Sequence, residues 1–134
     1  MTPFSNALVY YRKRAGLSQT NLAKRLGVAI QYVWKLEHAA KPPPSREQIE
    51  RITALLEMSD ADIASLFEAA QDSQKKLQLP DNLRSDTLRM INRMVRAATR
   101  LNWDDVMLLD ELVTKMDQRG RRRSTLSGVR LPPR

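Results

Sequence analysis

Residues 17–38 constrain the fold more than any other stretch, because they read as two short helices joined by a sharp turn. Ser18 stands where a helix N-cap belongs, immediately before an apolar run with helical spacing. The members of that run, which lie on one face of a helix, are Leu22, Ala23 and Leu26. Gly27 follows the run, and glycine adopts the positive φ of a tight turn at little cost. We therefore predict a helix, a turn at Gly27 and a second helix.

The second of these helices has an unusual outer face. Its inner face is expected to carry Ala29, Val33 and Leu36. At about 100° per residue, the opposite side then presents Ile30, Gln31, Trp34 and Lys35. Such a face suits a DNA major groove, where glutamine pairs with adenine, lysine pairs with guanine and apolar groups contact thymine methyls. The alternative is a partly buried helix whose tryptophan and isoleucine belong to the core.

The residues around this helix pair carry a longer signature. It reads Leu8-x-x-x-Arg12, then Gly16-Leu17-Ser18-Gln19-x-x-Leu22-Ala23-x-x-Leu26-Gly27-Val28, then Val33-x-x-Leu36-Glu37. In this respect residues 8–67 resemble the phage repressor and Cro type (XRE-like) of helix-turn-helix domain, over roughly half the chain. The resemblance implies an all-α fold, with a lambda-repressor-like bundle of about five helices that binds double-stranded DNA.

The resemblance also implies residue roles at the DNA. Gln19 would begin the first helix of the motif and dock on the DNA backbone. The base-facing positions would be Ala29, Ile30, Gln31 and Lys35, to which Trp34 is added because it shares their outer face. The family often has a polar residue where this chain has Ile30, so that contact would be apolar here.

The same resemblance implies an ion pair between Arg12 and Glu37 across the fold. Glu37 is the only acidic residue among the first 46, so without a partner it would be isolated in a basic region. The loop after the second helix departs from the family, which usually has glycine where this chain has Ala39 and Ala40.

Other polar and basic residues are candidates for phosphate contacts. The set comprises Ser18, Gln19, Lys24, Lys41, Arg46 and Arg14. A solvent-exposed helix surface is an equally good interpretation for a single basic residue such as Arg14 or Lys13.

Positive charge is concentrated at the two ends of the chain. The net charge of the chain is +8, and residues 1–46 contain eight basic residues and one acidic residue. Residues 47–118 contain nine basic and fourteen acidic residues, whereas residues 119–134 contain six arginines and no acid. This separation is typical of a protein that binds a polyanion.

Two further helices are predicted at about residues 83–100 and 103–118, with more apolar surface than two helices can bury against each other. We expect them to form a hairpin that dimerises as a four-helix interface. The predicted interface residues are Leu88, Ile91, Val95, Trp103, Val106, Leu109, Val113 and Met116. Packing within a monomer and binding of a second protein through residues 83–118 remain as alternatives.

The expected organisation has four parts: a DNA-binding domain over 1–75, a linker over 76–82, the hairpin over 83–118 and a flexible basic arm over 119–134. The arm contains Arg121, Arg122 and Arg123, which could follow phosphates or enter a minor groove. A tail that serves only solubility is the alternative.

Several function classes lack their sequence features. Cysteine is absent and His38 is the only histidine, so no metal site is expected, and no cofactor either. No glycine-rich phosphate loop, signal peptide or membrane span is recognisable, so we expect a non-enzymatic cytoplasmic protein associated with the nucleoid through DNA. The prediction is a homodimeric repressor of phage or prophage type on a palindromic operator. The alternative is an antitoxin-like autoregulator whose C-terminal helices bind a partner protein.

Overall fold

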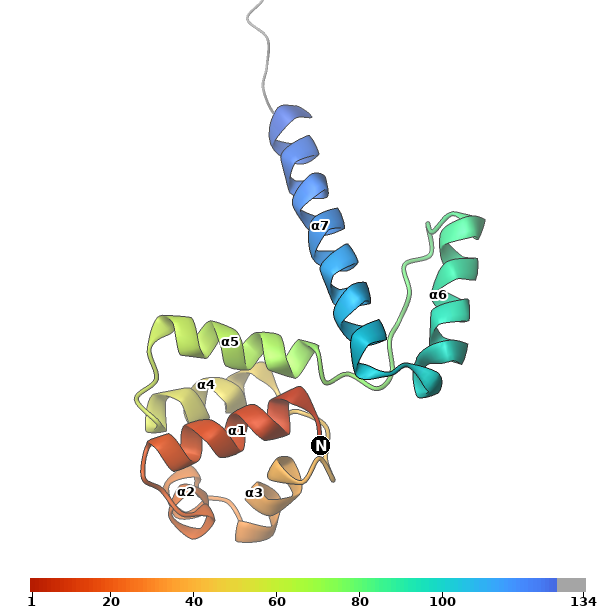
Figure 1. The fold of residues 1–134 in the computed structure, drawn as a ribbon. Helices are drawn as coiled ribbons and strands as arrows, with labels where there is room; N and C mark the ends of the chain where they lie inside the picture. The colour runs from red at the N-terminus through yellow and green to blue at the C-terminus, as the bar shows by residue number, and fades with distance from the viewer. Residues whose placement is uncertain (128–134) are drawn as a thin grey trace, which may run out of the picture. The chain divides into compact units, whose positions relative to one another are not determined.

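A computed structural model describes residues 1–127, with side chains as far as Ser124. The described residues form seven α-helices and one short 3-10 turn, with no β-strand among them (Figure 1). This confirms the predicted all-α fold. The chain divides into two compact units, Met1–Gln78 and Leu79–Arg134.

The N-terminal unit is a bundle of five helices (Figure 1). They are α1 (Pro3–Arg14), α2 (Gln19–Leu26), α3 (Ile30–Glu37), α4 (Arg46–Leu55) and α5 (Asp60–Gln71). Hydroxyl side chains cap the starts of α2, α4 and α5, since Ser18, Ser45 and Ser59 each accept a hydrogen bond from the backbone N–H three residues later. Short polar side chains of this kind satisfy amides that a helix start leaves unpaired.

Two glycines make the turns between α1, α2 and α3. Gly16 and Gly27 have φ values of 72° and 71°, in the left-handed region that glycine adopts without strain. Gly27 is the C-cap of α2, and its N–H donates to carbonyl oxygens of that helix. The predicted turn between the two helices of the motif is therefore present at Gly27.

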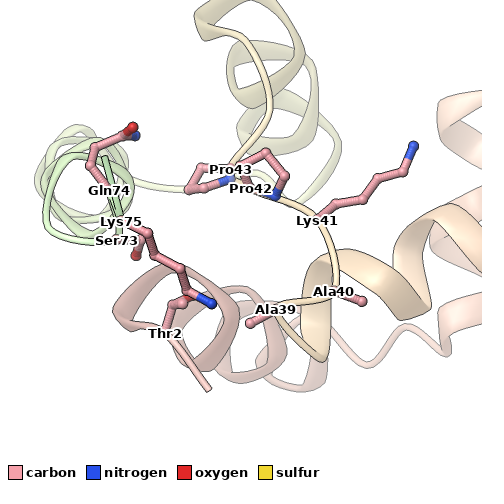
Figure 2. A pocket seen from close by; sticks show the side chains of 9 residues that line it. All are labelled: Thr2, Ala39, Ala40, Lys41, Pro42, Pro43, Ser73, Gln74 and Lys75. Atoms are coloured by element: carbon pink, nitrogen blue, oxygen red, sulfur yellow. The ribbon is translucent and has the colours of Figure 1, made fainter. Parts of the chain in front are cut away.

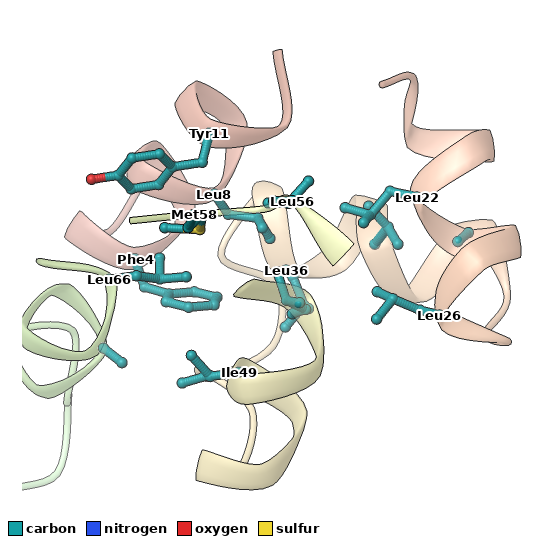
Figure 3. Packing of buried hydrophobic residues seen from close by; sticks show 14 residues of the cluster. Phe4, Leu8, Tyr11, Leu22, Leu26, Leu36, Ile49, Leu56, Met58 and Leu66 are labelled. Carbon is teal, nitrogen blue, oxygen red and sulfur yellow. The ribbon is translucent and has the colours of Figure 1, made fainter. Parts of the chain in front are cut away.

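One hydrophobic core holds the five helices together (Figure 3). Its buried members are Phe4, Leu8, Tyr11, Leu22, Ala23, Leu26, Val33, Leu36, Ile49, Ile52, Leu56, Met58, Leu66 and Ala70. The end of α5 is tied to the start of α1 because the Ser73 hydroxyl accepts from the Phe4 N–H at 2.8 Å and donates to the Ala69 carbonyl at 2.6 Å. Ser73 itself is buried, so the compact part of this unit extends to that residue.

The C-terminal unit contains α6 (Ser85–Ala97), the 3-10 turn η1 (Ala98–Arg100) and α7 (Trp103–Ser127). Asn102 caps α7, because its side-chain oxygen accepts from the Asp105 N–H at 2.8 Å. The Asp105 carboxylate accepts in return from the Asn102 N–H at 3.1 Å, which completes a capping box.

The expected flexible arm is helical over much of its length, which is a correction to the sequence analysis. Helix α7 runs to Ser127, so Arg121, Arg122 and Arg123 lie within it. Arginine is a good helix former, and Arg121 pairs with Asp117 one turn earlier at 3.2 Å. The rest of the predicted arm, residues 128–134, lies outside the described residues.

Candidate nucleic-acid interface

The outer face of α3 presents the side chains predicted to read bases. Ile30 is 40% exposed and Trp34 is 47% exposed, whereas Val33 and Leu36 are buried in the core. The alternative that placed this isoleucine and tryptophan in the core is therefore wrong. Ala29 is also exposed, as the N-cap of α3, so its expected place on the inner face is wrong.

These side chains form the walls of an open hollow. It is lined by Gln19 from the start of α2 and by Ile30, Gln31, Trp34 and Lys35 from α3. The turn at Gly27 sets α3 so that Gln19 stands beside its outer face. Four of the five predicted base-contacting residues thus share one concave surface with a predicted backbone-contacting residue.

Two of the walls are held by contacts outside the hollow. The Trp34 ring stacks on the His38 ring with centroids 4.1 Å apart and planes inclined by 17°. His38 is anchored in turn, because its Nδ1 lies 2.8 Å from the Trp34 carbonyl oxygen. On the other side, the Gln19 amide nitrogen donates to the Glu37 carboxylate.

Glu37 is the centre of a buried polar network that joins three segments of the N-terminal unit. The structure brings it together with Arg12, as the resemblance implied. The Arg12 Nε donates to one carboxylate oxygen, and its Nη2 lies 3.3 Å from the other. The Arg12 Nη1 also donates to the Leu17 carbonyl at 2.8 Å. The network therefore fixes the end of α3 against α1 and against the chain that enters α2.

Burial of Glu37 leaves the surface of residues 1–46 without an exposed acid. Glu37 is only 1% exposed, and it is the one acidic residue in this segment. Apart from His38 and Tyr10, the exposed ionisable side chains here are basic: Lys13, Arg14, Lys24, Arg25, Lys35, Lys41 and Arg46. A surface of one charge sign around a helix pair attracts a polyanion.

The predicted phosphate contacts differ in their surroundings. Ser18 uses its hydroxyl as the cap of α2, accepting from the Asn21 N–H at 3.0 Å, and Lys24 is exposed in the last turn of that helix. Arg46 lies 3.3 Å from Glu50 in an exposed pair. Lys41 lies over the Tyr32 ring, 5.3 Å from its centroid, and burial raises the pKa of the Tyr32 phenol.

Arg14 is the phosphate candidate most engaged within the protein. Its Nη2 lies 2.7 Å from an Asp62 carboxylate oxygen, and its guanidinium lies 4.8 Å from the Tyr11 ring centroid. The hydrogen bond from Arg14 holds the pKa of Asp62 below its ordinary value, and the same bond raises the pKa of Arg14. Arg14 therefore joins α1 to α5, a role that the sequence analysis missed because Asp62 lies 48 residues away.

A second hollow, which the sequence did not indicate, lies where the start of α1, the loop before α4 and the segment after α5 meet (Figure 2). Its lining residues are Thr2, Ala39, Ala40, Lys41, Pro42, Pro43, Ser73, Gln74 and Lys75. Figure 2 shows the Lys41 side chain pointing away from this hollow. Lys41 is therefore available on the outer surface of the loop.

The residues predicted at a dimer interface lie on α6 and α7. Six are exposed, namely Leu88, Val95, Trp103, Val106, Val113 and Met116. Ile91 and Leu109 are half-buried, and Leu109 lines a mainly apolar hollow with Met90, Arg93, Met94, Ala97 and Leu101. Exposed apolar side chains in this number are unusual for a monomer surface.

Two further features of the described residues bear on the possible chemistry. Within the described part of the chain, no group of three or more histidine, cysteine or acidic side chains could hold a metal ion. Among the described helices, none carries an apolar stretch of the length that a membrane span requires.

Comparison with known proteins shows what the N-terminal unit is similar to. Residues 7–66 match the family described as "Helix-turn-helix domain". This part of the N-terminal unit is therefore similar to helix-turn-helix domains, a class of DNA-binding fold. The chain is also similar to a chain in a solved structure entitled "SinR protein/SinI protein complex", at 22% identity and a TM-score of 0.42, covering 85% of this chain and 98% of that one. Comparison with curated proteins gives no match.

Proposed function

We propose that this protein is a sequence-specific DNA-binding transcriptional regulator, and not an enzyme, with α3 as its recognition helix. The observation that carries the proposal is the outer face of α3, where base-reading side chain types are exposed within a segment, residues 1–46, that has no exposed acid. Gln31 and Lys35 would hydrogen-bond to base edges, while Ala29, Ile30 and Trp34 would make apolar contacts.

Phosphate contacts would set the position of α3 in the groove. Gln19 is suited to this role because Glu37 holds its amide nitrogen, which leaves the amide group in a fixed orientation beside α3. Lys24 in α2 is an exposed basic residue, as are Lys41 and Arg46 after α3. Such contacts fix the register on the duplex, and they make affinity depend on salt.

We further propose that the protein acts as a homodimer assembled through α6 and α7. The two helices carry patches of opposite charge. Residues 85–100 contain four arginines and one acid, whereas residues 103–118, the part of α7 before its run of arginines, contain five acids and one lysine. In a two-fold interface every contact between two different surfaces occurs twice. The basic patch on α6 of each copy can therefore lie against the acidic patch on α7 of the other copy. Their exposed apolar side chains support the same arrangement.

A two-fold dimer would present two recognition helices to successive major grooves, about 34 Å apart. It would therefore read a palindromic site. Occupation of such a site within a promoter blocks transcription, so a repressor of phage-repressor or Cro type is the role we propose.

Selection of bound sites from random duplex DNA, with the full chain, tests the proposal. A palindromic consensus is expected. Gln31→Ala should then weaken binding to that consensus by about 1–3 kcal/mol and relax preference at one base step in each half-site. Gln71→Ala, the same change at an exposed position at the end of α5, serves as the matched control and should leave binding unchanged. Recovery of no preferred sequence would contradict the proposal.

The exposed apolar surface of α6 and α7 also favours a second candidate, an antitoxin-like autoregulator whose C-terminal unit binds a different protein. Sedimentation of the purified chain separates the two. A concentration-independent dimer supports the first candidate, and a monomeric or aggregating chain supports the second.

A further inference from the structure

The hollow on α3 is largely apolar, which recognition of bases through hydrogen bonds alone does not require. Ile30 and Trp34 give it an apolar surface, and Gln19, Gln31 and Lys35 place polar groups around them. We infer that this hollow receives the C5 methyl group of a pyrimidine in the major groove, so that the protein reads thymine, and equally 5-methylcytosine, through the methyl. This inference rests on the proposed function.

The chemistry of the groove leaves one occupant. The thymine methyl is the largest apolar group that unmodified base pairs display on the major-groove edge. Cytosine presents only a C5–H at the same place, and the groups read by hydrogen bonds are donors or acceptors. A carbonyl oxygen or an amino group placed between Ile30 and Trp34 would lose its water without gaining a partner. A methyl group placed there loses nothing and removes exposed apolar surface from water.

Gln31 and Lys35, the polar residues beside Ile30 and Trp34, are suited to contact the bases next to that methyl group. A methyl group at the hollow would bring neighbouring acceptors and donors within reach of Gln31 and Lys35, which line it from the same helix. Those two side chains can hydrogen-bond to adenine and guanine edges. The hollow therefore combines a methyl contact with polar contacts to adjoining bases.

The hollow is also formed before DNA arrives. Trp34 is held by its stack on His38, and Gln19 is held by its bond to the buried Glu37. His38 is thus a positioning residue for the tryptophan wall. Side chains already fixed in their bound arrangement lose little conformational freedom on binding, so even one methyl contact should contribute measurably to affinity.

The test uses the full chain and the duplex recovered by selection from random DNA. Each thymine is replaced in turn by deoxyuridine, which removes the methyl and leaves base pairing intact. One thymine in each half-site should prove sensitive, with a loss of about fourfold for each methyl removed. At that same step, a duplex with 5-methylcytosine opposite guanine should bind about fourfold more tightly than the duplex with unmodified cytosine.

Protein variants assign the effect to the hollow. Trp34→Ala and Ile30→Ala each remove an exposed wall, so folding measured by thermal unfolding should be retained while the ratio of thymine to deoxyuridine affinity falls towards one. Lys24→Gln is the control, because the loss of a phosphate contact should lower affinity for both duplexes and leave their ratio unchanged. His38→Ala should reduce the ratio less than Trp34→Ala, since it loosens the wall without removing it.

The possible outcomes distinguish a failure of this inference from a failure of the proposed function on which it rests. A preferred sequence whose binding is indifferent to every deoxyuridine replacement would overturn the methyl contact and leave the DNA-binding proposal standing. A sensitive thymine whose effect persists in both wall variants would place the methyl elsewhere and overturn the inference as well. Failure to recover any preferred sequence would refute both.

Discussion

Glu37 is charged, almost fully buried and bonded to residues of two other segments of its unit. Replacement by leucine would leave the Arg12 guanidinium buried without its counter-charge. Loss of one member of a buried pair costs about 3–5 kcal/mol, and we expect Glu37→Leu to lower the free energy of unfolding of the N-terminal unit by about 3 kcal/mol, because Arg12 retains some exposure and its bond to Leu17.

Denaturant unfolding of the full chain measures this effect. The chain has two tryptophans, so a Trp103→Phe background leaves Trp34 fluorescence as a probe of the N-terminal unit. Lys13→Leu, at the exposed neighbour of Arg12, is the control and should change stability by no more than about 0.5 kcal/mol. The double variant Arg12→Leu with Glu37→Leu should be more stable than the sum of its two single changes. Additive losses would show that the two side chains do not act as a pair.

The ion pair between Asp62 and Arg14, unlike the buried pair of Glu37, is partly exposed, and it predicts that the stability of the N-terminal unit depends on pH. The hydrogen bond from Arg14 lowers the pKa of the Asp62 carboxyl below the ordinary value of 3.8. A carboxyl whose folded-state pKa is depressed contributes stability that is fully present above its unfolded pKa and is lost as the pH falls through the folded value. Asp62→Asn should therefore be less stable than the parent chain near neutral pH, and the difference in stability should begin to narrow below about pH 4.

Urea midpoints at pH 7 and at pH 3 test this prediction. The effect should be small, because both side chains are partly exposed and water screens the pair. Asp60→Asn, at a carboxyl in the same first turn of α5, is the matched control for loss of charge at that helix start. If the two variants behaved alike at both pH values, the bond to Arg14 would have no part in the effect.

The candidate site shows which side chains a sequence can place and which it cannot. Helical periodicity put Ile30, Gln31, Trp34 and Lys35 on one outer face because their spacing follows directly from the helix geometry. The stack of Trp34 on His38 and the bond between Gln19 and Glu37 depend on side-chain rotamers and on tertiary approach, which periodicity does not encode. For the same reason Arg14 was read as a phosphate contact when it also pairs with Asp62.

Two residues with positive φ, at the ends of α2 and α3, allow substitutions that are expected to change stability in opposite directions. Gly27 at the end of α2 has φ 71°, and a Cβ added there would meet no heavy atom within 4 Å. Gly27→Ala should therefore cost only the backbone strain of the left-handed region, about 1 kcal/mol. Ala39, after α3, already carries such strain at φ 55°. Ala39→Gly should relieve it and stabilise the unit by about 0.5 kcal/mol, after the extra freedom that glycine gives the unfolded chain.

The same Trp34 fluorescence measurement, in the Trp103→Phe background, follows both changes. Ala40→Gly, at the next residue of the loop, is the control, since Ala40 is not among the residues with positive φ and should gain nothing from glycine. Equal stabilisation at both alanines would mean that φ strain at Ala39 is not the cause.

The helices of the N-terminal unit could be predicted because their caps and turns are local, as at Ser18, Gly27 and Ser45. The end of α7 could not be predicted in this way. The run of arginines after Gln118 lacks an apolar stripe and was interpreted as a flexible arm, yet arginine favours helix and Asp117 supplies a partner one turn away. A sequence without an apolar stripe can therefore still be helical. The missing stripe shows only that such a helix has no buried face.

Dimerisation through α7 connects the two units in one functional prediction. Val113 is exposed and lies in the helix that we propose as part of the interface, so Val113→Glu should leave the helices intact and place a charge where a second copy must pack. Gln118→Glu adds the same charge to the same helix at an exposed polar position outside the proposed interface residues. Sedimentation equilibrium should show a monomer for the first variant and a dimer for the second.

The affinity for DNA should depend on the oligomeric state, and two duplexes distinguish the effect of base recognition from the effect of dimerisation. A palindromic duplex engages both recognition helices of a dimer, and the second contact forms at a high effective concentration, which raises affinity by about 10²-fold or more. Val113→Glu should lose that gain on the palindrome but bind a single half-site as the parent chain does, in fluorescence anisotropy at fixed salt. If Val113→Glu were monomeric yet bound the palindrome with full affinity, each chain would read its site alone and α7 would serve another partner. If half-site binding fell as well, the C-terminal unit would itself contribute to the DNA contact.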